Sequence, residues 1–357
     1  IHMVHKAILI GVNYLNNNKY RLSSPINDIK IMKDFLINYC NFQEDNIILL
    51  SDSPTENESA SFFNIVKHIK LMAKELTSED YFFMYFSGHG SRIYDANGDE
   101  ADKTDEMFLP QDWQVSYISD DLLNSLLKTF KSRIFMMFDC CNSGTICDLK
   151  YSYDVKNMTM IDYIKKNNDD MPDIICCSSC GENANSFEKF YNKNMINVDE
   201  NKFYGEFTIF FVHALKGYLE DKLNFDEFTY FDLIKLINFY TCEFADNGSG
   251  NVSNQLLHKQ IYSTNLKPFV NFSFIDIKNL KFLKSRDDEE KERYKKEGAI
   301  NKLKKKTVSS LAYKILRFNR KIEFLEKKLD VLTVRNNKLL TIINKNSLSN
   351  SFGLLIR

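Results

Sequence analysis

A histidine between two glycines follows one apolar segment of the chain, and a pair of cysteines follows another. The segment YFFMYFSGHG carries His89 as its second-last residue, and FDCCNSGT places Cys140 and Cys141 before a small turn, with Cys141 lying 52 residues after His89. A thiol reacts as its thiolate, and a neighbouring imidazole can remove its proton. The two residues therefore predict nucleophilic catalysis by a Cys–His dyad, with the amides of Gly90 and Cys141 as an oxyanion hole.

The segments around these residues alternate between short apolar runs and amphipathic helical patterns. Strands are expected at His5–Gly11, Asn46–Leu50, Tyr81–Phe86, Arg133–Phe138, Asp173–Cys177 and His258–Ser263. Helices are expected at Ile26–Tyr39, Ser59–Leu76, Ser119–Phe130, Glu206–Leu219 and Thr229–Phe244. This alternation predicts an α/β fold with a mostly parallel sheet that helices cover on both faces. Sites in such sheets lie beyond the carboxyl ends of the strands, so His89 and Cys141 are expected at one edge.

Charge divides the chain into two parts. Residues 1–275 hold 25 Lys and Arg against 38 Asp and Glu, a net charge of −13, whereas residues 276–357 hold 22 against 10, a net charge of +12. We therefore expect an acidic domain at 4–275, followed by a basic helical extension at 276–357.

The extension carries apolar residues at heptad spacing. Its seam consists of Leu311, Ile315, Phe318, Ile322, Leu325, Leu329, Leu332, Asn336, Leu339 and Ile343. Such a seam is typical of a helix that forms a coiled coil, which would give a homodimer through 311–343, or that packs on its own catalytic domain as a regulator. Nucleic-acid binding through KLKKK at 302–306 is the weakest interpretation, because no aromatic residues accompany the lysines.

Eight cysteines are spaced irregularly, which favours free thiols in a reducing compartment over disulfides. Cys177 and Cys180 form one C-x-x-C pair, but no second pair follows at the spacing of a zinc site, and burial is the favoured interpretation. No apolar run approaches the length of a membrane span, and AILIGV at 7–12 is too short for a signal peptide, so we expect a cytoplasmic protein.

Two motifs resemble those of the metacaspases, the caspase-related cysteine peptidases. They are YFSGHGS at 85–91 and FDCCNSGT at 138–145, supported by ILIGVNYL at 8–15 and NDIKIM at 27–32, and the resemblance extends over about residues 4–275. It implies a type I-like enzyme with the caspase–haemoglobinase fold, in which His89 is the base and Cys141 the nucleophile. It also implies that the catalytic domain at 4–275 divides into a large part at about 4–150 and a small part at about 172–275. Asn142 stands where the family commonly has His, and CCSSCGENANSFE at 176–188 matches the family pattern only loosely.

The resemblance also implies the substrate class and the metal. Asp28 and Asp139 match acidic residues of the metacaspase S1 pocket, and Ser87 matches a residue near it. Two carboxylates in a pocket pair with a basic side chain and repel an acidic one, so we expect cleavage after Arg or Lys. From the residues alone, Asp28 serves equally well as a helix N-cap.

Four further aspartates match the calcium ligands of metacaspases. They are Asp105, Asp120, Asp121 and Asp148. Hard oxygen ligands from separate loops suit Ca²⁺, and each aspartate alone would pass as a solvated carboxylate or, for Asp120, as a helix cap. The predicted function is thus a calcium-dependent cysteine endopeptidase acting on protein and peptide substrates, as in programmed cell death.

Self-processing follows from the same specificity. The candidate cleavage sites are Lys165, Lys166, Lys189, Lys193 and Lys202. The alternative functions are an inactive caspase-like scaffold that acts through its C-terminal helix, and a calcium-independent peptidase resembling paracaspases or legumain.

Overall fold

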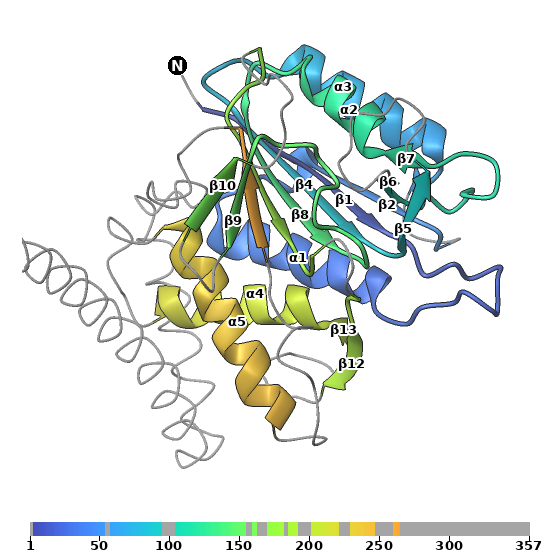
Figure 1. Cartoon of the computed structure of the whole chain (residues 1–357), viewed down its shortest axis with the longest axis vertical. Helices are drawn as coiled ribbons and strands as arrows, with labels where there is room; N and C mark the ends of the chain where they lie inside the picture. Colours follow the sequence, from blue (N-terminus) through green and yellow to red (C-terminus); the bar gives the residue numbers. More distant parts are fainter. Residues whose placement is uncertain are drawn as a thin grey trace, which may run out of the picture. The chain divides into compact units, whose positions relative to one another are not determined.

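Figure 1 shows the computed structural model of the chain, which describes residues 3–53, 58–94, 104–154, 159–162, 170–181, 185–191, 201–220, 229–246 and 260–264. The chain divides into two compact units, Ile1–Ala299 and Ile300–Arg357. All described residues belong to the first unit. The predicted extension at 276–357 lies outside the described residues, and so do Lys165, Lys166 and Lys193. In the described ranges, none of the helices combines the length and apolarity that crossing a membrane requires.

A nine-stranded sheet forms the centre of the first unit (Figure 1). Its order is β10 (Thr159–Asp162), β9 (Tyr151–Asp154), β14 (Gln260–Ser263), β11 (Ile174–Ser178), β8 (Arg133–Asp139), β4 (Tyr81–Ser87), β1 (His5–Gly11), β2 (Ile47–Ser51) and β3 (Glu58–Ser59). The strands from β11 to β3 are parallel, and β14, β9 and β10 join them antiparallel. The mostly parallel sheet that the sequence predicts is confirmed.

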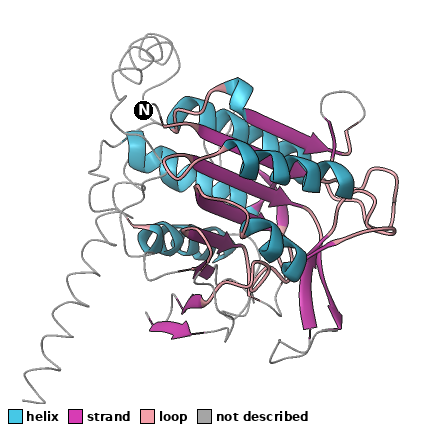
Figure 2. Cartoon of the chain, turned by 90° about the horizontal axis from the view of Figure 1, so that it is seen from above, coloured by secondary structure: helices cyan, strands magenta, loops and turns pink. Residues whose placement is uncertain are grey.

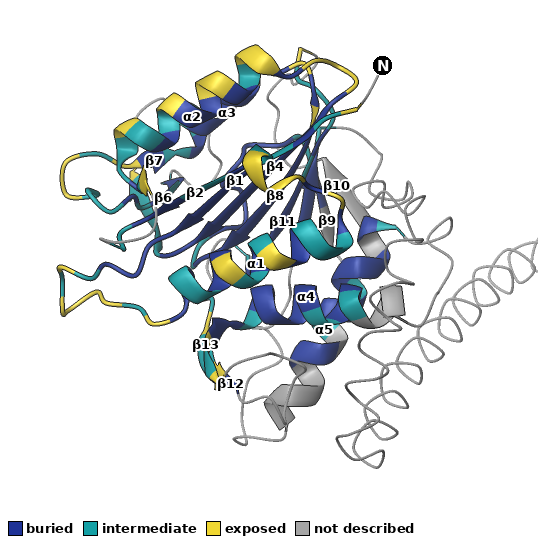
Figure 3. Ribbon diagram, turned by 180° about the vertical axis from the view of Figure 1, so that it is seen from behind, coloured by how far each residue is buried: buried dark blue, intermediate teal, exposed yellow. Residues whose placement is uncertain are grey.

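Helices cover both faces of the sheet. On one face lie α2 (Phe62–Glu75) and α3 (Asp120–Leu127); on the other lie α1 (Pro25–Tyr39), α4 (Glu206–Glu220) and α5 (Tyr230–Asp246) (Figures 1 and 3). Seen from above, the helices run alongside the strands (Figure 2). The outer sides of α2 and α3 are exposed, while the strands between the layers are buried (Figure 3). All five predicted helices are therefore present, and the predicted helix-flanked α/β fold is confirmed.

Alternation along β4 decides which side chains face which helix layer. Phe82 stacks on Phe130, which follows α3, with ring centroids 4.9 Å apart. Phe83 points the other way and stacks on Phe135 of β8 at 5.5 Å, beneath Phe211 of α4. Successive side chains of a strand point to opposite faces, so Ser87, four residues after Phe83, lies on the face that α1 and α4 cover.

The helix expected at Ser59–Leu76 begins later. Glu58 and Ser59 form the edge strand β3, and the helix starts at Phe62 after Ser61, whose hydroxyl accepts the backbone N–H of Asn64 at 3.3 Å. A serine cap of this kind satisfies one of the free N–H groups of the first turn, and it outweighs the helical pattern of the preceding residues.

None of the strands expected from the sequence lies between His89 and Ser119, but the structure contains three there. β5 (Gly90–Tyr94) pairs antiparallel with β6 (Thr104–Phe108), and β6 pairs with β7 (Ile118–Ser119). A second small sheet is formed by β12 (Glu188–Tyr191) and β13 (Lys202–Gly205), and a 3₁₀ turn at Glu44–Asn46 precedes β2. Polar residues fill much of β5 and β6, so the apolar alternation that identifies a strand is missing there.

Candidate active site

The register between β4 and β8 brings His89 and Cys141 to one edge of the sheet. Ser87 and Asp139 are direct neighbours across the two parallel strands. His89 and Cys141 each follow this pair by two residues, on adjacent strands that run in the same direction. The predicted meeting of these two residues at the carboxyl ends of the strands is what the topology produces.

Gly90 lies directly against the backbone of Cys141. A Cβ atom built on Gly90 would lie 1.9 Å from the carbonyl oxygen of Cys141 and 3.1 Å from the Sγ atom of Cys140. No side chain fits in that space, so glycine is required here for close approach of two backbones. The peptide that carries His89 is thereby packed against the peptide that carries the thiol.

The backbone of His89 is fixed by two residues. Its N–H donates to the hydroxyl of Tyr14 at 2.9 Å, and that hydroxyl donates to the carbonyl of Leu109 at 2.7 Å. The N–H of Leu109 donates in turn to the carbonyl of His89 at 3.0 Å. The ring of Tyr14 also packs on the imidazole, with centroids 4.7 Å apart. This closed set of hydrogen bonds holds the histidine in place.

The imidazole of His89 has a defined tautomer. Its Nε2 atom lies 2.7 Å from the carbonyl oxygen of Tyr20, and the ring of Tyr20 packs edge-on against Trp113, with centroids 5.4 Å apart. A carbonyl only accepts hydrogen bonds, so Nε2 carries the proton. In the neutral ring Nδ1 is then the basic nitrogen.

The thiol of Cys141 is held by Ser186, in the segment that leads into β12. The N–H of Ser186 donates to Sγ at 3.4 Å, and the thiol donates to the Ser186 carbonyl at 3.8 Å. Burial raises the pKa of the Cys141 thiol, so the resting group is protonated. Among the described residues, the hydrogen bonds of the His89 ring and of the Cys141 thiol go to Tyr20 and Ser186 and not to each other.

Asp28 of α1 is fully buried beside the same edge of the sheet. Its Oδ2 atom accepts the hydroxyl of Ser87 at 2.8 Å, and its Oδ1 atom accepts the N–H of Gly205 at 2.9 Å. The alternative role as a helix N-cap does not hold, because the cap of α1 is Ser24 and Asp28 lies inside the helix. The contact between Ser87 and Asp28 follows from the strand alternation, because Ser87 points to the face that α1 covers.

Asp139 is the second carboxylate of this pocket. Its Oδ1 atom accepts the hydroxyl of Ser186 at 2.6 Å, and its Oδ2 atom accepts the N–H and the hydroxyl of Thr208 at 3.0 and 2.6 Å. A Cβ atom on Gly205 would lie 2.2 Å from Oδ2 of Asp139 and 3.1 Å from Oδ2 of Asp28, so these two oxygens are within 5.3 Å of each other, the sum of the two distances.

Asp28 and Asp139 receive their described hydrogen bonds from neutral groups. Burial, followed by the charge of Asp139, raises the pKa of Asp28 well above its ordinary value. In the part of the chain that the structure describes, every hydrogen bond to Asp28 and Asp139 comes from a neutral group, and neither carboxylate forms an ion pair with Lys or Arg. The three predicted pocket residues Ser87, Asp28 and Asp139 therefore meet at one place.

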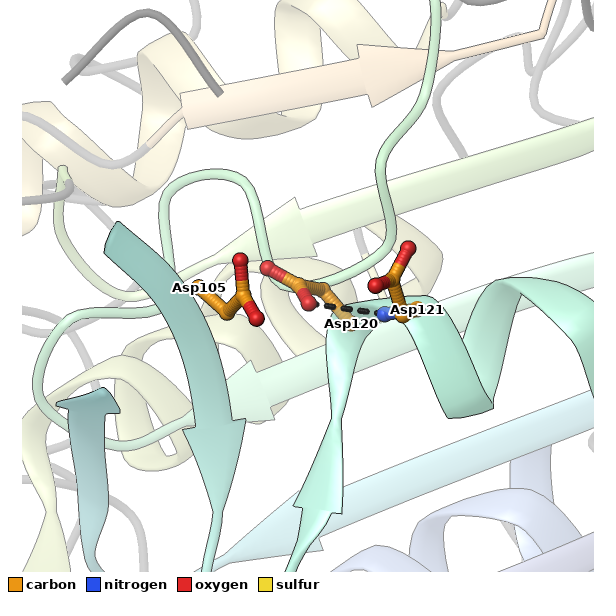
Figure 4. Close-up of side chains that lie close together, drawn as sticks. All are labelled: Asp105, Asp120 and Asp121. Atoms are coloured by element: carbon orange, nitrogen blue, oxygen red, sulfur yellow. Dashed lines mark hydrogen bonds between the residues drawn. The ribbon is translucent and has the colours of Figure 1, made fainter. Parts of the chain in front are cut away.

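Three of the predicted calcium ligands form a cluster. Asp105 lies on β6, and Asp120 and Asp121 begin α3; one carboxylate oxygen from each of the three lies within 4.8 Å of the other two (Figure 4). Oδ1 of Asp120 accepts the N–H of Asp121 at 2.7 Å, the dashed line in Figure 4, and Oδ2 accepts the N–H of Glu106 at 2.8 Å. The cap of α3 is Ser119, so Asp120 is not the helix cap.

The cluster accumulates negative charge in a buried place. Burial raises the pKa of Asp120 to about 8, and the charges of Asp148 and Asp105 contribute to the rise. Asp148 is itself buried and has a positive φ of 48°, an uncommon backbone conformation that aspartate tolerates. Oxygen ligands at this density fit a hard divalent cation, which would remove the mutual repulsion of the carboxylates.

Sequence reasoning missed several residues of the site. Ser186, Gly205 and Thr208 contact the pocket carboxylates or the thiol, and Tyr20 orients His89. Much of their contribution comes from backbone groups, which any residue type carries, so no sequence signal marks them. Among the described residues, the cysteines outside the site are buried thiols, and they include Cys177 and Cys180.

The chain was compared with protein families and with curated relatives. Residues 5–150 match the family model described as metacaspase, peptidase C14 domain. Metacaspase-1 of Candida glabrata is 33% identical over 158 residues, which are 43% of this chain and 40% of that protein. Metacaspase-1B of Neurospora crassa is 33% identical over 159 residues, 43% of this chain and 37% of that protein. Metacaspase-1 of Candida albicans is 35% identical over 163 residues, 43% of this chain and 36% of that protein.

The alignments thus cover about two fifths of the length of the curated relatives. Among solved structures, protein GSU0716 from Geobacter sulfurreducens matches with a TM-score of 0.50 at 19% identity, over 76% of this chain and 98% of that one, a likeness of fold alone. Residues 5–150, which carry both His89 and Cys141, are thus similar to the peptidase C14 domain of the metacaspases, a family of cysteine peptidases.

Proposed function

We propose that the protein is a calcium-dependent cysteine endopeptidase that cleaves peptide bonds after Arg or Lys through Cys141 and His89. The register of β4 and β8 carries this proposal, because it places the imidazole and the thiol two residues beyond one cross-strand pair. The packing of Gly90 against the Cys141 carbonyl supports it. The range that matches the metacaspase family model, residues 5–150, includes both residues.

The reaction begins with a protonated thiol, because burial raises the pKa of Cys141. His89 takes the proton on Nδ1 while Nε2–H stays on the Tyr20 carbonyl. The sulfur attacks the scissile carbonyl, and the imidazolium returns the proton to the leaving amine. Water then hydrolyses the thioester, with His89 again as the base. The amides of Gly90 and Cys141 are the proposed donors to the oxyanion.

The specificity proposal rests on Asp28 and Asp139. Both are buried, both are satisfied by neutral donors, and their oxygens are within 5.3 Å of each other. A guanidinium or ammonium group between them would pair with the charge that the fold leaves uncompensated, whereas an acidic side chain would be repelled. A basic side chain at Oδ1 of Asp139 would share or replace the hydrogen bond that the Ser186 hydroxyl donates to that oxygen.

The calcium proposal rests on Asp105, Asp120 and Asp121, with Asp148 beside them. Calcium held by these carboxylates would supply the positive charge that neutralises them. Self-processing after lysine remains part of the proposal. Lys189 and Lys202 lie in the paired strands β12 and β13, so cleavage after either requires that hairpin to open first.

The test is hydrolysis of fluorogenic peptides that end in Arg, Lys or Asp. Wild-type protein and Cys141→Ala are assayed with millimolar calcium or with a chelator. Calcium-dependent release after Arg or Lys, absent from the variant, is expected. Equal turnover in chelator would favour a calcium-independent, paracaspase-like peptidase, and no turnover in any condition would favour a scaffold that acts through the C-terminal helix.

A further inference from the structure

Glu106 joins the acidic cluster through its backbone. It follows Asp105 on β6, and its side chain is buried, with 1% of its surface exposed. Its N–H donates to Oδ2 of Asp120 at 2.8 Å. A change in the position of Asp120 therefore acts directly on the peptide of Glu106.

The side chain of Glu106 contacts both segments that carry the catalytic residues. Its Oε1 atom accepts the Nε–H of Arg92 at 2.9 Å, and Arg92 is its direct cross-strand partner on β5. Its Oε2 atom accepts the hydroxyl of Thr145. Arg92 follows His89 by three residues, and Thr145 follows Cys141 by four. One carboxylate thus bridges the strand after the imidazole and the turn after the thiol.

These contacts are of the strong kind. Hydrogen bonds to an ionised carboxylate are about twice as strong as neutral ones, and burial keeps water from competing for them. The turn itself is linked to the cluster, because the N–H of Asp148 donates to the Thr145 carbonyl at 2.8 Å. Beyond Phe108, β6 continues into Leu109, whose N–H holds the carbonyl of His89.

We propose that Glu106 is a positioning residue that couples cation binding at the Asp105–Asp120 cluster to the placement of the turn after Cys141. The inference rests on the proposed calcium-dependent function. A cation that draws Asp105 and Asp120 together fixes the Glu106 peptide between them. The Glu106 carboxylate then fixes Thr145, and with it the turn that follows the nucleophile.

The experiment compares Thr145→Val with Thr145→Ser in the full chain. Valine matches threonine in shape but removes the hydroxyl, whereas serine keeps the hydroxyl and removes a methyl group. In neither variant does the side chain at position 145 touch the proposed calcium ligands. Calcium binding is measured by calorimetry with calcium chloride, hydrogen exchange of the amides at 140–150 is followed with and without calcium, and kcat and KM are measured for an Arg peptide. Melting in chelator shows whether each variant is folded.

All three proteins are expected to bind calcium with half-saturation within about twofold of one another. Calcium should protect the 140–150 amides in wild type and Thr145→Ser but not in Thr145→Val, whose kcat should fall roughly tenfold with KM unchanged, the effect of one lost charge-assisted hydrogen bond. Glu106→Gln should behave like Thr145→Val, because it removes the charge that both contacts share.

Protection and kcat of Thr145→Val equal to those of Thr145→Ser would overturn the coupling while leaving the peptidase intact. Wild-type protein that gains calcium protection but cleaves no peptide would overturn the proposed peptidase and retain the coupling. Calorimetry that detects no calcium binding to wild type would overturn both.

Discussion

Replacing Asp28 by Asn should make the protein more stable and far less active. The oxygens of Asp28 and Asp139 are within 5.3 Å of each other, and both side chains are buried. At an effective dielectric constant of about 20, two unit charges at that distance repel by about 3 kcal/mol. An asparagine can keep the contacts of Asp28 with Gly205 and Ser87, since its amide oxygen can accept from Gly205 and its amide N–H can donate to the Ser87 hydroxyl. The free energy of unfolding should rise by about 2–3 kcal/mol when Asp28 is ionised.

The gain in the free energy of unfolding of Asp28→Asn should grow as the pH rises. Burial and the charge of Asp139 raise the pKa of Asp28 above its ordinary value of 3.8. A carboxyl whose pKa is raised by folding stabilises the folded state below its ordinary pKa and loses that contribution as the pH rises through the raised value. Wild type therefore weakens over this window, and the advantage of Asp28→Asn should grow with pH. It should be near zero at pH 3.5.

The assay is urea unfolding in chelator across this pH range, paired with kcat/KM for an Arg peptide. Removing one charge from a buried pair costs about 3–5 kcal/mol, so kcat/KM should fall at least about 100-fold. Asp80→Asn is the control with the opposite sign. Burial raises the pKa of Asp80, but hydrogen bonds from Thr77 and Val4 outweigh it and the net shift is downward.

The carboxylate of Asp80 accepts hydrogen bonds from Val4 and Thr77 and donates none. An asparagine would turn its own N–H toward one of these donors, so the free energy of unfolding of Asp80→Asn should be lower by about 1–3 kcal/mol. Its stabilising effect is present above pH 3.8 and is lost as the pH falls. The reasoning fails if Asp28→Asn is less stable than wild type throughout the range, or if it cleaves the Arg peptide at the wild-type rate.

Three further predictions concern the remaining parts of the site. Because burial raises the pKa of Asp120 to about 8, calcium must displace a proton when it binds below that pH. The calcium concentration at half-saturation should therefore rise by up to about tenfold when the pH falls from about 7.5 to 6.5. Calorimetry that finds no such change would contradict the cluster as the calcium site. Since burial raises the pKa of the Cys141 thiol, iodoacetamide should react with Cys141 of the calcium-free protein at pH 7.5 more slowly than it reacts with free glutathione. Mass spectrometry that shows Cys141 reacting faster than glutathione would refute the protonated resting state. Gly90→Ala would place a Cβ 1.9 Å from the Cys141 carbonyl, so urea unfolding should show a loss of about 3 kcal/mol and peptidase assays no turnover, and wild-type behaviour in either would count against that contact.

The sequence alone determined the edge of the sheet and the two candidate catalytic residues on it. β4 and β8 are continuous buried runs that end in small or polar residues, and parallel strands place their carboxyl ends side by side. His89 and Cys141 follow those ends directly, so their convergence is a local consequence of strand length and direction.

Only the tertiary structure decided what surrounds them. Asp28 receives its backbone hydrogen bond from Gly205, 177 residues further along the chain, and Tyr20 reaches the imidazole through a carbonyl that any residue would offer. The polar strands β5 and β6 carry no apolar alternation, so the pairing of Arg92 with Glu106 becomes visible only once the strands are placed. Long-range contacts made by backbone groups and by buried polar side chains leave no local pattern in a sequence, because their energy depends on partners that the fold brings together.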